Sequence, residues 1–101
     1  PTGLWTELVD RSLRPVHEAL LLRLQQHLGL PQPDDELQAL VVCLTALGVH
    51  VHVGHEVTAQ LAPQLDLADL DAWMARLVRA GRAMVDAERA RRLAATQERQ
   101  A

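Results

Sequence analysis

The stretch that decides the fold is DDELQALVVCLTALGVHVHVGHEVTAQL, residues 34–61. It opens with acidic residues that can cap a helix, Asp34 or Asp35, and Asp35 with Gln38 makes an acceptable capping box. The middle of the stretch is apolar on nearly every side, and no proline interrupts it before Pro63. It therefore predicts one helix that ends at about residue 59 or 61 and is buried on all sides.

Residues 49–53, Val-His-Val-His-Val, offer an alternative within this stretch. Their strict alternation of β-branched and polar residues is typical of a short strand. A helix is favoured here because the chain holds no second strand for it to pair with, and a lone strand is not stable.

A second helix is predicted upstream, over residues 2–28, where apolar residues recur every three to five positions. Pro15 lies inside this run, and an interior proline removes a backbone hydrogen bond and crowds the preceding turn. We therefore expect a kink or break near Leu13 and Arg14. Gly29 is well placed to end the helix, since glycine adopts the left-handed conformation that such ends require.

A third helix is predicted from an Asp66 cap to about Glu88, with Asp69 in its first turn. Three arginines on it are interpreted as a solvated face: Arg76, Arg79 and Arg82. Beyond Glu88 the chain has little to bury. The sequence thus predicts a helical domain over residues 1–92 and a frayed or disordered tail over residues 93–101.

The composition supports an all-α domain of three long helices and limits its chemistry. The 101 residues include no Phe, Tyr, Ile, Lys or Asn, and the net charge is −3. A chain with this charge lacks the basic face that DNA binding needs. Its single cysteine, Cys43, excludes an internal disulfide and fits a reducing compartment, so we expect a cytoplasmic protein without a membrane span.

Three histidines cluster at His50, His52 and His55, and imidazole is a common metal ligand. On a helix only His52 and His55 share a face, so we interpret them as interior or interface histidines. Metal binding stays an alternative. Cys43 is interpreted as a buried small hydrophobe. No catalytic arrangement or cofactor motif is present, so the sequence predicts neither an enzyme nor a cofactor.

The residue pattern resembles the last three helices of TetR-family transcriptional regulators, and in detail their CecR-like branch. The resemblance rests on several short runs: Pro1-Thr2, Leu8-Val9, Arg14-Pro15-Val16-His17 with Leu20 and Leu24, Asp34-Asp35, and Leu44-Thr45-Ala46-Leu47-Gly48. It extends to about Arg92. Where branch members often have an aromatic–arginine pair, this chain has Val53-Gly54.

The resemblance implies a domain that binds a small effector and dimerises through its last two long helices, forming a four-helix bundle with its partner. DNA would be bound only by an N-terminal helix-turn-helix domain, which this chain does not contain. The effector is expected to be small and apolar, with contacts from four residues: Trp5, Leu8, Cys43 and Leu47.

The apolar residues exceed what three helices can cover, which favours a homodimer built on the second and third helices. The expected interface residues are Val51, His52, His55, Leu70, Trp73, Leu77, Gly81 and Met84. Two alternatives remain from other classes. One is a free-standing helical module that binds a different protein, and the other is a metal-binding protein that uses His52 and His55.

Overall fold

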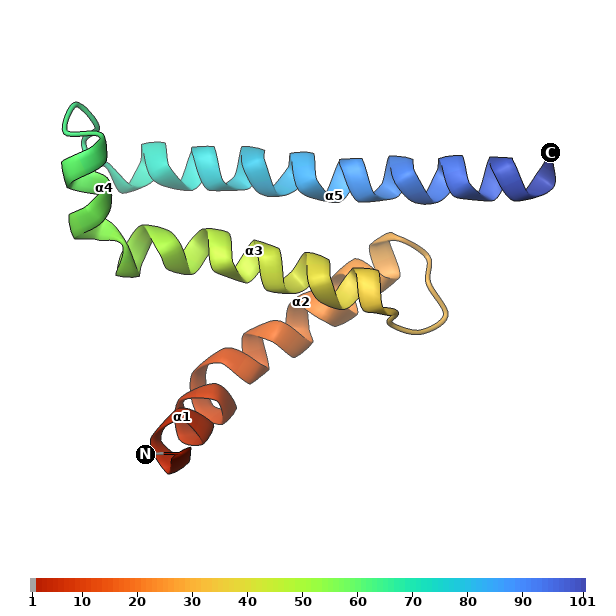
Figure 1. Cartoon of the computed structure of the whole chain (residues 1–101), viewed down its shortest axis with the longest axis horizontal. Coiled ribbons are helices and arrows are strands. Elements are labelled where there is room, and N and C mark those ends of the chain that lie inside the picture. The colour runs from red at the N-terminus through yellow and green to blue at the C-terminus, as the bar shows by residue number, and fades with distance from the viewer. Residues whose placement is uncertain (1) are drawn as a thin grey trace. The chain divides into compact units, whose positions relative to one another are not determined.

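The computed structural model describes residues 2–101, with side chains at residues 3–50 and 54–101, and all its regular elements are helices (Figure 1). The predicted all-α class is therefore confirmed. The chain divides into two units, Pro1–Thr45 and Ala46–Ala101, which are described separately.

The first unit begins with a run of three helical elements: α1 (Thr2–Leu8), the π-helix η1 (Val9–Leu13) and α2 (Arg14–His27). The Arg14 N–H donates to the carbonyl of Val9, five residues earlier, as a π-helix requires. Pro15 follows in the first turn of α2 and supplies no N–H to the helical hydrogen bonds there. The helix therefore changes type at the expected place, whereas a kink at Pro15 stays a prediction.

Helix α2 ends as the sequence predicts. Gly29 has φ of +68°, and it is the residue with positive φ in the described part of the chain. The N–H of Leu30 donates to the carbonyl of Gln25, and the Gln25 amide donates to the carbonyls of Leu30 and Pro31. The bond from Leu30 satisfies a carbonyl in the last turn of α2 that would otherwise be unpaired, and the Gln25 amide ties the following loop to the helix.

Helix α3 (Asp35–Val53) is capped by Asp34, whose Oδ1 accepts from the backbone N–H of Leu37 at 2.9 Å. Gln38 takes no part in a capping box with Asp35, because its Oε1 lies 2.8 Å from His17 Nε2 on α2. The buried apolar residues are Leu37, Leu40 and Val41. Their spacing puts them on one face of α3, near the point where His17 joins the two helices.

The prediction of a single helix over residues 34–61 is wrong in one respect, since the helix is interrupted at Gly54. A short helix, α4 (His55–Leu61), follows the break. Residues 49–53 are helical as predicted, and no strand occurs within residues 2–101. In the same range no single helix is long and apolar enough to cross a membrane, and α3 with α4 reaches that length only when both are counted across their break.

Helix α5 (Leu70–Gln100) differs from the prediction at both ends. Asp69 is its cap and accepts from the Ala72 N–H at 3.1 Å, whereas Asp66 lies in the preceding turn and accepts from Ala68. The predicted end near Glu88 is wrong, because the helix continues to Gln100. Good helix formers fill the later turns, so local propensity maintains the helix without burial.

Candidate interaction surface

One side of α3 remains open within the described chain. Opposite the buried face, small and apolar residues recur at helical spacing and are exposed: Ala39, Val42, Ala46 and Val49. Val42 is 57% exposed and Val49 is 41% exposed. Cys43 is also exposed, which corrects the expectation that its thiol lies among buried apolar residues. A helix that is apolar all round is thus covered here on one side only.

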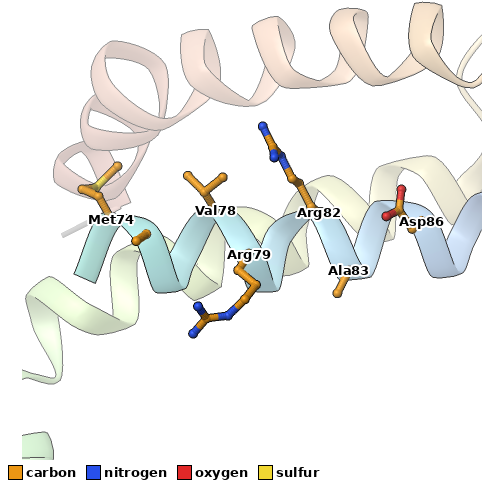
Figure 2. Close-up of a pocket in the computed structure, with 7 residues that line it drawn as sticks. Met74, Val78, Arg79, Arg82, Ala83 and Asp86 are labelled. Atoms are coloured by element: carbon orange, nitrogen blue, oxygen red, sulfur yellow. The ribbon is translucent and has the colours of Figure 1, made fainter. Parts of the chain in front are cut away.

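Helix α5 carries a second open face, which we call the α5 groove. Its volume is about 600 Å³ and its lining residues are Met74, Ala75, Val78, Arg79, Arg82, Ala83 and Asp86. Met74 is 58% exposed and Val78 is 46% exposed. Figure 2 shows Met74, Val78, Arg82 and Asp86 leaving the helix on the same side. Because one helix supplies all its walls, this groove is an open surface and not an enclosed cavity.

The opposite face of α5 holds most of the predicted dimer residues. Trp73, Leu77, Gly81 and Met84 are half-buried, while Leu70 is 66% exposed. His55, on α4, is exposed. The side chains of Val51 and His52 lie outside the described residues. The predicted interface therefore includes residues that the chain partly covers by itself, together with two, Leu70 and His55, that it leaves open.

Trp73 has a local role that the sequence did not indicate. Its indole N–H donates to the carbonyl of Asp66 at 3.2 Å, which ties the turn before α5 to the first turns of the helix. The Arg76 guanidinium lies 5.0 Å from the centre of the indole ring, within the range of a cation–π contact. Trp73 thus stabilises the start of α5 through contacts within its own unit.

The break between α3 and α4 depends on the absence of a side chain at Gly54. A Cβ atom there would lie 2.8 Å from the carbonyl oxygen of His50 and 2.9 Å from its ring Cε1. The Gly54 N–H donates to that same carbonyl at 2.7 Å. By contrast, a Cβ at Gly48 would meet nothing within 4 Å. Of the two glycines, only Gly54 is required, because only there would a Cβ atom come too close to a neighbouring group.

The four predicted effector contacts lie on different elements. Trp5 and Leu8 are on α1, where they are 69% and 43% exposed, while Cys43 and the half-buried Leu47 are on α3. A separate shallow groove of about 400 Å³ runs along α2, and its walls are Pro15, Val16, Ala19, Leu20 and Arg23. None of the four predicted residues lines this groove or the α5 groove, so an effector site at these positions stays a prediction.

A charged cluster lies further along α5. The guanidinium of Arg91 donates to both carboxylate oxygens of Glu88, at 2.9 and 2.7 Å, and Arg92 Nε lies 2.7 Å from Oε2. The hydrogen bond from Arg91 is the largest of the effects that lower the pKa of Glu88 below its ordinary value of 4.5. These groups stabilise the helix locally and form no catalytic pair.

The structure gives little evidence that the histidine cluster binds a metal ion. Among residues whose side chains the structure describes, no group of three or more His, Cys, Asp or Glu residues could hold a metal ion. His52 lies outside that set. Within this cluster, His50 lies close to Gly54.

Sequence reasoning missed the α5 groove. Arg79 and Arg82 are exposed, as the sequence predicts for a solvated face. However, Met74 and Val78 are apolar residues one turn apart beside those arginines, and this spacing was a signal that could have located the groove.

These features define a helical domain with a small core at the start of α3 and open apolar faces on α3 and α5. Residues 1–88 match the C-terminal domain of the HTH-type transcriptional dual regulator CecR, and the chain belongs to this family of TetR-type regulator domains. The family is one of transcriptional regulators and not of enzymes. No curated protein and no solved structure matches the chain.

Proposed function

We propose that this chain is the effector-binding and dimerisation domain of a TetR-type transcriptional repressor. The two copies form an isologous homodimer in which α3 and α5 of each copy make a four-helix bundle. The observation that carries the proposal is the set of large apolar side chains left open on these helices, which includes the predicted interface residue Leu70, at 66% exposed, together with Val42 and Val49. Soluble monomers rarely keep such faces uncovered unless they bind something.

The accessible surface supports association. The chain exposes 7880 Å². A compact monomer of 11.2 kDa is expected to expose roughly 5700 Å², and two separate compact bodies of half that mass would expose roughly 6900 Å². The excess of about 1000 Å² or more per copy is of the size that each partner buries in a stable interface.

The residues proposed for the seam lie in the second unit, on α3, α4 and the first half of α5. They are Val51, His52, His55, Leu70, Trp73, Leu77, Gly81 and Met84. The half-buried state of Trp73, Leu77 and Met84 is compatible with completion by a partner. Since Trp73 also ties its own turn to α5, its replacement would disturb the fold as well as the seam.

The rest of the proposal follows the family. A small apolar effector would be contacted by Trp5, Leu8, Cys43 and Leu47, and its binding would change the equilibrium between two arrangements of the dimer. DNA would be bound by an N-terminal helix-turn-helix domain that is not in this sequence. The site of action would be the cytoplasm, and no metal or cofactor is invoked.

Light scattering over a hundredfold range of concentration tests the dimer. We expect the mass of two chains at the upper end, with dissociation on dilution. A folded monomer throughout the range would overturn the homodimer and favour the alternative of a module that binds a different protein. Fluorescence of Trp5 and Trp73 during titration with small apolar compounds tests the effector. A saturable change with one class supports it, and no change with any class argues against it.

A further inference from the structure

We infer that the α5 groove binds an acidic, amphipathic helix of a different protein. The groove stays open in the proposed homodimer, because its lining residues and the seam residues lie on opposite faces of α5. Trp73, Leu77 and Met84 of the seam are half-buried, whereas Met74 and Val78 of the groove are exposed. The inference goes beyond the proposed function and does not depend on it, since a single chain presents the same groove.

The charge of this part of α5 selects an acidic partner. Residues 72–85 contain three arginines and no acidic residue, whereas the whole chain has a net charge of −3. Arg79 and Arg82 line the groove, both are exposed, and neither forms an ion pair within the described part of the chain. An acidic segment is therefore attracted to this stretch and repelled by the net negative charge of the remainder.

Apolar side chains beside these arginines favour a helical segment over a free anion. Met74 is 58% exposed and Val78 is 46% exposed, and they lie one turn apart, with Ala75 and Ala83 also lining the groove. The lining residues extend from Met74 to Asp86, which is about 18 Å along the helix axis. About three to four turns of a second helix cover that length. Met74 is unbranched, so its side chain adapts to the shape of an apolar partner.

Nucleic acid and membranes fit the groove less well. Asp86 is one of its lining residues, and Figure 2 shows it on the same side of α5 as Arg82. A phosphate backbone repels this carboxylate, whereas a helix that carries one basic residue among its acidic ones pairs with it. Binding to a membrane interface needs a broad apolar face, and the large apolar side chains that line this groove are Met74 and Val78.

Two designed peptides test the inference with the intact chain. The acidic peptide is a helix of about four turns with leucines on one face and glutamates with a single arginine beside them, and the basic peptide has lysines in place of the glutamates. Fluorescence anisotropy of the labelled peptides measures the dissociation constants. We expect saturable binding of the acidic peptide, at least about tenfold weaker binding of the basic peptide, and weaker binding of the acidic peptide as salt is added.

Substitutions in the groove locate the binding site. Arg79→Glu combined with Arg82→Glu reverses the charge, so it should weaken binding of the acidic peptide at least about tenfold and strengthen binding of the basic peptide. Val78→Asp removes an apolar contact and adds a like charge, so it should also weaken binding of the acidic peptide at least about tenfold. Arg99→Glu, at an exposed arginine outside the groove, is the matched control and should stay within about twofold of the parent chain. Unchanged circular dichroism shows that each variant keeps its fold.

The outcomes separate this inference from the homodimer. Equal binding of the two peptides overturns it, and so does an equal loss in the Arg99 control and the groove variants. Absence of binding by the acidic peptide also overturns it, whether or not a DNA duplex or vesicles of phosphatidylcholine and phosphatidylserine bind. Light scattering should give the groove variants the mass of the parent chain, and a lower mass would place the groove in the seam and overturn docking there. If the parent chain is monomeric and the acidic peptide binds, the homodimer fails and this inference stands.

Discussion

The first half of α3 and the long helix α5 contain similar apolar residues, but apolar side chains are fully buried only in α3. Leu37 and Val41 of α3 are fully buried, in a helix that His17 of α2 joins through Gln38. In α5, with 31 residues, no residue with a described side chain is buried. A side chain is buried only where another element covers its side of the helix. The apolar content of a helix therefore does not by itself determine burial.

The difference predicts that stability and the proposed association depend on different residues. The residues that hold the chain together are few and lie at the start of α3. The apolar residues of the α5 groove contribute little to the single chain and are free to contact a partner. Substitutions should therefore separate folding from assembly.

The largest effect is expected for Leu37→Ala. The side chain is fully buried, so its truncation removes apolar contact and leaves a cavity, at a cost of about 2–5 kcal/mol in the free energy of unfolding. Chemical denaturation measures it. Leu22→Ala is the matched control on α2, where Leu22 is 55% exposed, and should cost well under about 1 kcal/mol. Equal losses at the two positions would contradict the difference in burial.

The next effect tests the break after α3. Gly54→Ala places a Cβ against the His50 carbonyl, so the backbone must shift, and we expect a loss of about 1–3 kcal/mol. Gly48→Ala has open space in the helix interior and should gain about 0.5–1 kcal/mol. Thermal unfolding of the pair would show opposite signs. A gain in both would mean that Gly54 is not required at the break.

A smaller effect is expected at the start of α5. Asp69→Ala removes the acceptor of the Ala72 N–H and should cost about 1 kcal/mol. Asp66→Ala removes only an acceptor in the preceding turn, so it should cost less. Thermal melts compare the two. A larger loss at Asp66 would favour the cap that the sequence alone suggested.

The smallest effect concerns pH. Because the pKa of Glu88 is lowered in the folded chain, the stability it contributes is present above the ordinary carboxyl value of 4.5 and is lost as the pH falls through the folded value. Glu88→Gln should abolish that part of the acid dependence, with a change below about 1 kcal/mol at neutral pH. Denaturation curves between pH 7 and pH 3 provide the measurement. Glu98→Gln, near the exposed end of α5, should leave the curve as it is.

Much of the fold was predictable from local physical chemistry. Glycine is the residue that tolerates the φ of +68° found at Gly29, and the helical spacing of apolar residues locates the first helical run. The candidate site was less predictable. The predicted interface positions Leu77 and Met84 came from helical periodicity, whereas the groove residues Met74, Val78, Arg82 and Asp86 required knowledge of which side of α5 stays open.

The sequence by itself determined the all-α class, the end of α2 and the helical state of residues 49–53, because these depend on neighbours a few positions away. Only the tertiary structure decided the rest. It buries Leu37 and Val41 while leaving Val42 and Cys43 open, and it brings Gln38 of α3 against His17 of α2. Each of these depends on which group approaches a position in space, and residue spacing along one helix does not contain that information.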